Sequence, residues 1–480
     1  MMQCQYKHLI NGQWESSETL GANINPSDLD DLVGNYAQGD QQQTINAIEA
    51  AKTAFQSWSC SPIQQRFDML DAVGSEILAR KDELAKLLAR EEGKALSDAL
   101  GEVIRAGQIF KFFAGECVRQ TGDKLASTRQ GMEVEVTREP VGVVGLITPW
   151  NFPIAIPAWK IAPALAYGNT VVFKPAELVP ASAWALADII HRAGAPAGVF
   201  NLVLGKGSIV GETLVNHLDV AAISFTGSEG TGRNIASKVV ARMGKVQLEM
   251  GGKNPLVVLD DADLEVAAEV AVNGAFYATG QRCTASSRFI VTKGIHDRFV
   301  AAVVNKMGKL EVGHALDTNT KIGPVVDKKQ LDNVCQYIRV GKDEGAKLAF
   351  GGEILQRKTK GFFLQPTLFT QANSSMRIAK EEIFGPVACV IKVADYEEAL
   401  AVANDTVFGL SSGIVTTSLK YANHFKRHAH SGMVMVNAPT AGVDYHVPFG
   451  GRNGSSYGSR EQGRYAAEFY TTVKTVYIAS

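Results

Sequence analysis

The sequence predicts an α/β fold with at least two domains built on parallel sheets. Three observations predict it: a length of 480 residues, an apolar share of 46%, and short apolar runs that alternate with helical patterns beyond Pro140. One hydrophobic core rarely extends over so many residues. Continuous Val, Ile and Leu runs with helices between them are typical of parallel sheets that are covered on both faces.

Helices are expected first, over residues 47–88, where apolar side chains recur at helical spacing. Short apolar runs then indicate buried strands. The strands expected in a first sheet lie at 141–147, 170–173, 199–203 and 221–225. The strands expected in a second sheet, beyond Gly252, lie at 255–259, 289–291, 387–393 and 433–436, with helices such as 299–307 and 397–403 between them.

Two further strands are predicted outside these sheets. Residues 132–137 and 472–478 alternate apolar and polar side chains, as half-exposed strands do. One lies in mid-chain and the other near the C-terminus. We expect them to pair with each other and to reach a neighbouring subunit.

Charge and cysteine content restrict the partners. The chain has 48 basic and 49 acidic residues and a net charge of −1, which gives no electrostatic footprint for nucleic acid or an anionic membrane. Its six cysteines have no paired spacing, so neither a disulfide framework nor a metal site is expected. No apolar run suits a signal peptide or a membrane span. The sequence predicts a cytoplasmic protein that acts on a small molecule.

Cys283 is the first candidate catalytic residue. It lies in a polar segment, residues 280–287, that reads GQRCTASS. Arg282 would favour the reactive thiolate if its side chain points toward the sulfur. A buried structural cysteine is the alternative interpretation.

Glu249 and Asn151 offer two further functions. Glu249 ends an apolar stretch before two glycines, so burial would raise its pKa and suit it to act as a general base. Asn151 follows a buried strand, where its amide and the backbone N–H of Cys283 could hold an oxyanion. The alternatives are a solvated carboxylate and an asparagine that only caps a turn. A thiol, a carboxylate and an amide together predict oxidation of an aldehyde through a thioester, with a nicotinamide as hydride acceptor.

Two segments are candidates for binding the nicotinamide cofactor. Residues 225–232, reading FTGSEGTG, predict a strand, a glycine-rich turn and a helix whose free N–H groups would hold a pyrophosphate, although they do not fit GxGxxG. Lys174 and Glu177 follow another buried strand and could reach the hydroxyls of an adenosine ribose. A solvated pair at a turn is the alternative. The acid at Glu177 would disfavour a 2′-phosphate, which favours NAD over NADP.

These segments resemble the aldehyde dehydrogenase family, over residues 10–478. The motifs that carry the resemblance are TPWNFP at 148, FKPAE at 173, FTGS at 225, LEMGGKNP at 248, GQRCTA at 280, EEIFGP at 381 and PFGG at 448. The resemblance implies a homodimer or homotetramer. It also implies three parts, which are a Rossmann-like cofactor domain (1–121 and 141–250), an α/β catalytic domain (251–459) and a small β oligomerisation domain (122–140 and 460–480).

The resemblance also implies roles for individual residues. Cys283 would be the nucleophile, Glu249 the general base and Asn151 the oxyanion donor, with Lys160 supporting the site. Residues that would hold NAD, or NADP as the alternative, are Trp150, Lys174, Glu177, Gly227, Ser228, Glu382 and Phe384. Residues that would form aromatic walls of the aldehyde tunnel are Phe152 and Phe449.

The chain departs from the family pattern after PFGG. Many relatives continue with a lysine and then a Ser-Gly pair, whereas residues 452–457 read RNGSSY. We expect the departure to leave the catalytic residues untouched.

Arg105 is the main clue to the substrate. It lies in residues 102–110, a stretch that in the family is a helix bordering the tunnel. Its guanidinium could bind a carboxylate at the far end of the substrate through two hydrogen bonds. A surface arginine is the alternative. Residues 154–167 and 274–288 most resemble family members that oxidise 2,5-dioxopentanoate, also called α-ketoglutaric semialdehyde. Succinic or glutaric semialdehyde is the nearest competitor, and Arg282 also matches relatives that act on phosphorylated or amino-acid-derived semialdehydes.

Two other functions stay open. A CoA-acylating dehydrogenase passes the thioester to a thiol and generally lacks the base, so Glu249 favours hydrolysis. A catalytically silent structural or binding protein on the same fold is the non-enzymatic alternative. The joint presence of Cys283, Glu249 and Asn151 disfavours it.

Overall fold

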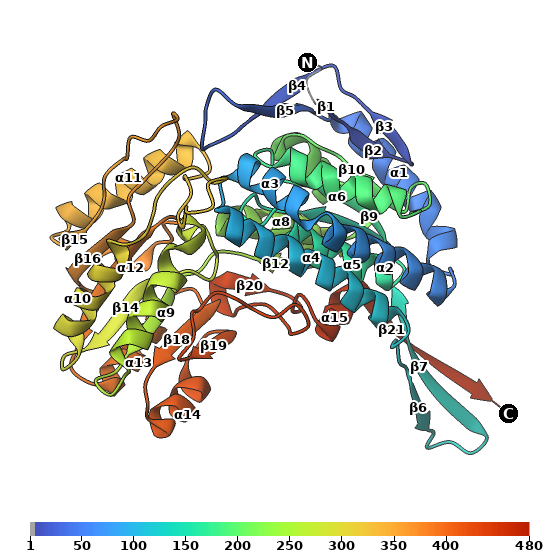
Figure 1. Cartoon of the computed structure of the whole chain (residues 1–480). Helices are drawn as coiled ribbons and strands as arrows, with labels where there is room; N and C mark the ends of the chain where they lie inside the picture. The colour runs from blue at the N-terminus through green and yellow to red at the C-terminus, as the bar shows by residue number, and fades with distance from the viewer. Residues whose placement is uncertain (1–4, 480) are drawn as a thin grey trace.

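The computed structural model describes residues 5–479, so that Cys4 lies outside the described residues. Two large sheets with helices on their faces form the body, and a narrow strand arm projects from it (Figure 1). The first sheet has, in spatial order, β20 (Ser456–Tyr457), β12 (Lys245–Glu249), β11 (Val220–Thr226), β8 (Val143–Ile147), β9 (Thr170–Lys174), β10 (Phe200–Leu202), β2 (His8–Ile10) and β3 (Gln13–Glu15).

The four strands predicted for this sheet are confirmed, and the run from β12 to β10 is parallel. Strands β2, β3 and β20 were not predicted, because two or three residues are too short to show a periodic pattern. β20 comes from the segment assigned to the catalytic domain but pairs with β12. The domain boundaries stay a prediction.

Helices cover the first sheet, and the helical pattern predicted over 47–88 is confirmed. The helices of this part are α1 (Gln41–Trp58), α2 (Ile63–Ala79), α3 (Lys81–Glu92), α4 (Leu96–Cys117), α5 (Ala155–Ala166), α6 (Pro180–Arg192), the π-turn η1 (Gly207–Gly211), α7 (Glu212–Asn216) and α8 (Glu229–Ala241). Gly93 ends α3 in the left-handed conformation, with φ of 89°, which turns the chain toward α4.

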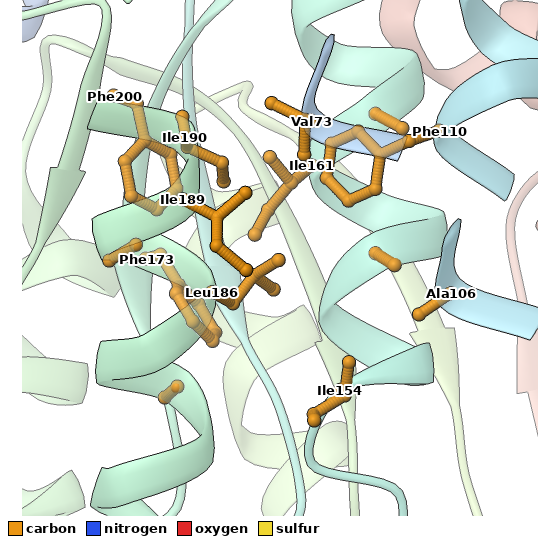
Figure 2. Close-up of a cluster of buried hydrophobic side chains, with 14 of the residues drawn as sticks. Val73, Ala106, Phe110, Ile154, Ile161, Phe173, Leu186, Ile189, Ile190 and Phe200 are labelled. Carbon is orange, nitrogen blue, oxygen red and sulfur yellow. The ribbon is translucent and has the colours of Figure 1, made fainter. Parts of the chain in front are cut away.

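A continuous apolar core lies between these helices and the sheet. Phe110 from α4, Ile161 from α5, Leu186 from α6 and Phe173 of β9 all belong to it (Figure 2). Each such side chain contributes roughly 1.5–3 kcal/mol when it is fully buried. The packing fixes α4 and α5, the two helices that carry Arg105 and Lys160.

The second sheet confirms the other predicted strands and the two named helices. Its strands, in spatial order, are β15 (Lys347–Phe350), β16 (Thr367–Ala372), β17 (Val387–Val393), β14 (Ser286–Thr292), β13 (Asn254–Val258), β18 (Ser411–Val415) and β19 (Met433–Val436). The helices of this part are α9 (Leu264–Phe276), the turn η2 (Tyr277–Gly280), α10 (His296–Met307), α11 (Lys328–Asp343), α12 (Arg377–Lys380), α13 (Tyr396–Asn404) and α14 (Leu419–His428).

The arm consists of β6 (Asp123–Ala126), β7 (Met132–Pro140) and β21 (Thr471–Ala479). β7 and β21 pair antiparallel along their full length, which confirms the predicted pairing of the two isolated strands. In Figure 1 the arm extends away from both sheets at the lower right. Smaller elements complete the fold, namely β1 (Gln5–Tyr6), β4 (Leu20–Ile24), β5 (Leu32–Ala37), η3 (Asn453–Ser455), η4 (Arg464–Ala466) and α15 (Ala467–Tyr470). Within residues 5–479, no helix is long and apolar enough to cross a bilayer.

The topology brings separate loops to one edge of the first sheet. In an open parallel sheet, ligands bind outside the carboxyl ends of the strands. Asn151 follows β8, Ser228 follows β11, and Lys174 and Glu249 end β9 and β12. The loop that carries Cys283 reaches the same place from the second sheet, just before β14.

Candidate active site

Cys283 lies between η2 and β14, where it lines two cavities. Asn254 Nδ2 donates to the backbone carbonyls of Cys283 and Ala285, at 2.7 and 3.0 Å. Just before the loop, Ala278 and Thr279 take φ values of 51° and 58°. Such strained backbone persists only where the surrounding structure imposes it. The thiol therefore has a fixed place.

The surroundings of Cys283 oppose formation of the thiolate. Desolvation, assisted by the carboxylates of Glu382 and Glu249, raises the pKa of the thiol to about 12. The condition under which Arg282 would favour the thiolate is not met, because its guanidinium is directed elsewhere. Nη2 lies 3.6 Å from Asp98 Oδ2, and Nη1 donates to the carbonyl of Asn273 at 3.4 Å. The thiol thus keeps its proton at neutral pH until a base removes it.

Glu249 ends β12 and is only 2% exposed, so it is not a solvated loop carboxylate. Burial, together with the negative charge of Glu461, raises its pKa well above the usual range. Its Oε2 accepts a hydrogen bond from Ser456 Oγ at 2.6 Å. Its Oε1 is buried without a hydrogen-bond partner among residues 5–479. That oxygen is free to accept a proton.

Ser456 lies in the segment where the chain departs from the family pattern. β20 places it opposite Glu249 on β12. The backbone N–H of Gly451 donates to Ser456 Oγ at 2.6 Å, so the hydroxyl hydrogen is directed to the Glu249 carboxylate. The expectation that this departure leaves Glu249 untouched is therefore wrong. A strand of two residues gives no signal from which its register could be predicted.

Lys160 is fully buried on α5 and belongs to a charged network beside Glu249. Its Nζ donates to Ser224 Oγ at 2.7 Å and forms an ion pair with Glu461. The positive charge of Lys160 partly opposes the rise in the pKa of Glu249. Glu461 was not predicted, because its neighbourhood in the sequence resembles an ordinary polar loop.

Asn151 contacts the loop that carries the thiol. Its Nδ2 donates to the carbonyl of Gln281 at 2.9 Å, and its own carbonyl accepts from Lys94 Nζ at 2.5 Å. Asn151 and Cys283 line the same cavity. Its role as an oxyanion donor stays a prediction.

A buried ion pair that sequence reasoning missed holds the Asn151 loop. Lys94 Nζ lies 2.6 Å from Glu102 Oε2, and both side chains are buried. Glu102 Oε1 accepts from the backbone N–H groups of Ile154 and Ala155, at 2.9 and 3.1 Å, at the start of α5. Breaking such a pair costs roughly 3–5 kcal/mol, because one charge is left buried alone. A sequence signal existed, since Glu102 lies on the apolar face of α4.

The smaller cavity, of about 220 Å³, contains most of the predicted cofactor residues. The rings of Trp150 and Phe384 meet edge to face at 5.4 Å. Glu382 Oε1 accepts from the N–H of Gly252 at 3.0 Å, and burial raises its pKa to about 7. The lining residues are Pro149, Trp150, Asn151, Ile156, Thr226, Gly227, Ser228, Met250, Gly251, Cys283, Gln330, Glu382 and Phe384.

The N-terminus of α8 lies beside this cavity, because Gly227 and Ser228, which precede the helix, line it. Ser228 precedes α8, but its hydroxyl donates to Thr231 Oγ1 at 2.9 Å rather than capping the helix. The backbone N–H groups of the first turn can therefore receive an anion. Gln330 was not predicted; its Nε2 donates to the carbonyls of Ile383 and Phe384, at 3.1 and 2.7 Å, and holds the Phe384 backbone.

Lys174 and Glu177 do not line that cavity but lie further along the same edge of the sheet. Lys174 is buried, which excludes a solvated lysine, and burial lowers its pKa to about 8. Its Nζ donates to the carbonyl of Pro175 at 2.7 Å. Glu177 Oε1 accepts from the backbone N–H of Gly207, at the start of η1, at 3.1 Å. Both roles toward an adenosine ribose stay predictions.

The larger cavity, of about 510 Å³, is also lined by Cys283. Its walls include the four residues predicted to contact the substrate, which are Arg105, Phe152, Arg282 and Phe449. Aromatic rings form much of the wall. Phe449 stacks on Trp159 with ring centres 5.2 Å apart, and Lys94 Nζ lies 3.8 Å from the centre of the Phe152 ring.

The charges of this cavity do not cancel. Its ionisable groups include Lys94, Arg105, Arg282, Asp98 and Glu102. Lys94 pairs with Glu102, and Arg282 with Asp98. In the described part of the chain, no carboxylate lies within 4 Å of the Arg105 guanidinium. Burial lowers its pKa only to about 10, so Arg105 stays positive at neutral pH. The surface interpretation of Arg105 is excluded.

Comparison with known proteins agrees with this arrangement. The model of the aldehyde dehydrogenase family matches residues 14–476. The chain is 44% identical over 477 residues to an alpha-ketoglutaric semialdehyde dehydrogenase of Bacillus subtilis, covering 98% of each chain. It is 42% identical over 457 residues to a 2,5-dioxopentanoate dehydrogenase of Saccharolobus solfataricus, covering 95% of each.

A solved structure has the same fold. It is betaine aldehyde dehydrogenase from Staphylococcus aureus in complex with NAD+, which is 33% identical with a TM-score of 0.96 and covers 100% of this chain and 95% of that one. Fold and matches place the protein among the NAD(P)-dependent oxidoreductases that act on aldehydes. The chain belongs to the aldehyde dehydrogenase family.

Proposed function

We propose that the protein oxidises 2,5-dioxopentanoate, an aldehyde with a carboxylate at its far end, to the dicarboxylic acid. The observation that carries this proposal is the uncompensated charge of Arg105 in the cavity that Cys283 lines. A guanidinium binds a carboxylate through two parallel hydrogen bonds. The relatives named for this substrate match along almost the full chain, which supports the choice over other semialdehydes.

The first bond forms between Cys283 Sγ and the aldehyde carbon. The raised pKa of the thiol means that a base must remove its proton, and Glu249, with its own raised pKa and unpartnered Oε1, is suited to accept it. The aldehyde oxygen then carries the negative charge. Asn151 Nδ2 and the Cys283 backbone N–H are the donors that stabilise it.

The smaller cavity fits the nicotinamide end of a dinucleotide, whose adenosine would extend toward Lys174 and Glu177. The first turn of α8 would hold its pyrophosphate, the Glu382 carboxylate a ribose, and Phe384 the ring. Glu177 favours NAD over NADP, because its negative charge would repel a 2′-phosphate. When bound, the cofactor would supply the hydride acceptor for the carbon attached to Cys283, and loss of that hydride would leave a thioester on the sulfur.

Glu249 then serves the hydrolytic step. It first releases the proton of the Cys283 thiol to solvent, and then takes a proton from a water molecule, whose oxygen attacks the thioester carbon. The carbon–sulfur bond breaks, the acid leaves, and Cys283 regains a proton. The buried carboxyl of Glu249 argues against transfer of the acyl group to a thiol such as CoA. That transfer does not use water, so it needs no base to activate a water molecule.

Replacing Arg105 by leucine tests the substrate. We expect the KM for 2,5-dioxopentanoate to rise about tenfold to a hundredfold, because one charge-assisted contact is lost. The kcat should change little. Steady-state NAD reduction is measured for 2,5-dioxopentanoate, succinic semialdehyde and an uncharged aldehyde of similar length. If the KM changed only for the uncharged aldehyde, the proposed carboxylate contact would have to be abandoned.

Replacing Ser456 by alanine tests the environment of the base. The hydroxyl bond favours the charged form of Glu249, so its loss raises the pKa of Glu249 further. Hydrolysis needs the unprotonated carboxylate, so its rate rises with pH as Glu249 loses its proton. In Ser456→Ala this rise should occur about one pH unit higher. The measurement is the pH dependence of acyl-enzyme hydrolysis. Tyr457→Phe, on the same strand, is the control, and a rise at an unchanged pH in Ser456→Ala would contradict the expected effect.

We also propose that the arm joins two copies of the chain. β21 is an edge strand of the arm, and Val473 and Tyr477 on it are each 56% exposed. Unpaired edge strands with exposed apolar side chains favour association. We propose that the assembly is a homodimer or homotetramer. The free thiols of Cys60 and Cys335 fit a location in the reducing cytoplasm. Light scattering of the purified protein tests the oligomeric state.

A further inference from the structure

Gln462 lies directly behind Arg105, outside the lining of the larger cavity. Its Oε1 accepts a hydrogen bond from Arg105 Nη2 at 2.9 Å, and the residue is fully buried. On another side of the guanidinium, the ring centre of Trp159 lies 5.4 Å from the Arg105 Cζ. The amide and the indole together define the direction in which Arg105 points.

The backbone holds Gln462 firmly in this place. Its φ is 60°, in the left-handed region that favours glycine. The preceding residue, Glu461, exchanges backbone hydrogen bonds with Phe449 at 2.7 and 2.9 Å, and its side chain pairs with Lys160. The Gln462 backbone therefore cannot shift without disturbing a buried network, which fixes the point from which its side chain reaches Arg105.

Gln462 also retains a feature that packing alone does not explain. Its Nε2 is buried without a hydrogen-bond partner within the described range of residues. A buried amide with one unsatisfied end is unfavourable, and an apolar side chain of similar size would avoid the penalty. The contact to Arg105 is what the amide provides.

The neutrality of this contact matters for the charge of the cavity. Arg282 of the same cavity faces a carboxylate, Asp98, which compensates its charge. The amide oxygen of Gln462 orients Arg105 in a comparable way but contributes no negative charge. Arg105 is thus fixed in direction and still uncompensated.

We propose that Gln462 is a positioning residue for substrate specificity, which aims the Arg105 guanidinium at the substrate carboxylate while leaving its positive charge available. This inference rests on the proposed oxidation of a carboxylated aldehyde. The charged groups that face Arg105 more distantly are Glu102 on its own helix and Asp444 from the loop before Phe449. Gln462 acts at shorter range than either, through a direct hydrogen bond.

Two substitutions separate orientation from charge. Gln462→Glu keeps the shape and adds a carboxylate, so it should raise the KM for 2,5-dioxopentanoate at least about tenfold, because Arg105 becomes paired. Gln462→Met keeps the volume and removes the acceptor, so a rise of about threefold to tenfold is expected. In both variants the kcat, and the KM for an uncharged aldehyde of similar length, should stay close to those of the unaltered protein.

The Arg105→Leu variant is measured beside them. If it raises the KM for 2,5-dioxopentanoate while Gln462→Glu does not, Gln462 has no positioning role although the proposed substrate stands. If neither variant raises it, the proposed carboxylate contact itself fails. Calorimetric binding of 2-oxoglutarate, the product acid, gives a second readout that does not depend on turnover. Gln462→Glu should weaken it about tenfold, and unchanged binding would overturn the inference.

Discussion

Cys283→Ala should abolish aldehyde oxidation and leave cofactor binding intact. The thiol is the group that forms the covalent bond, and its loss removes the thioester route altogether, so we expect turnover to fall at least about ten-thousand-fold. The cofactor cavity keeps its other lining residues, among them Trp150, Glu382 and Phe384. The measurements are the rate of NAD reduction and the dissociation constant of NAD by calorimetry.

A matched control removes a thiol elsewhere. Cys60 is exposed and lines neither cavity, so Cys60→Ala should retain the activity of the unaltered protein. Substantial turnover by Cys283→Ala would mean that another group forms the covalent bond. An inactive unaltered protein with either nicotinamide would instead favour the catalytically silent scaffold.

Glu249→Gln should stall the enzyme after one hydride transfer. Glutamine preserves the shape and can still accept the Ser456 bond, but it cannot take a proton from water. We expect one equivalent of NADH per site to form, more slowly than in the unaltered protein because the thiol also loses its base, followed by turnover that is about a hundredfold to ten-thousandfold slower. Stopped-flow absorbance of NADH measures both phases, and acid quenching with mass spectrometry detects the acyl group on Cys283.

Glu382→Gln provides the comparison for this variant. Glu382 is a second carboxylate with a raised pKa near the thiol, but it is half-buried and lines the cofactor cavity. Its replacement should slow the formation of the first equivalent of NADH rather than the later phase. A Glu249→Gln variant that turned over at the rate of the unaltered protein would remove Glu249 from the hydrolytic step.

Much of the fold could be predicted because it rests on local patterns. The apolar runs at 141–147 and 387–393 are long enough to distinguish buried parallel strands from their surroundings. Strands such as β20 depend on pairing with a distant segment, and two residues carry no periodicity. The helices over 47–88 and the two arm strands could be predicted for the same reason, because each pattern repeats over enough residues.

Side-chain directions limited the prediction of the site. The types of residue around Cys283 indicated the chemistry, but the direction of Arg282 depends on Asp98, which is far away in the sequence. The contact of Ser456 with Glu249 likewise joins residues that are 207 positions apart. Such contacts join segments that are far apart in the sequence, and no local pattern encodes them.

Cys283 lies on the walls of two cavities, and the proposed mechanism gives one cavity to each reactant. The aldehyde would reach the sulfur from the larger cavity and the dinucleotide would bind in the smaller one, so neither would have to leave for the other to arrive. A spent dinucleotide could then depart while the acyl group stays attached to the sulfur. Under that arrangement, the walls of the two cavities would set the exposure of the reactive thioester to outside nucleophiles.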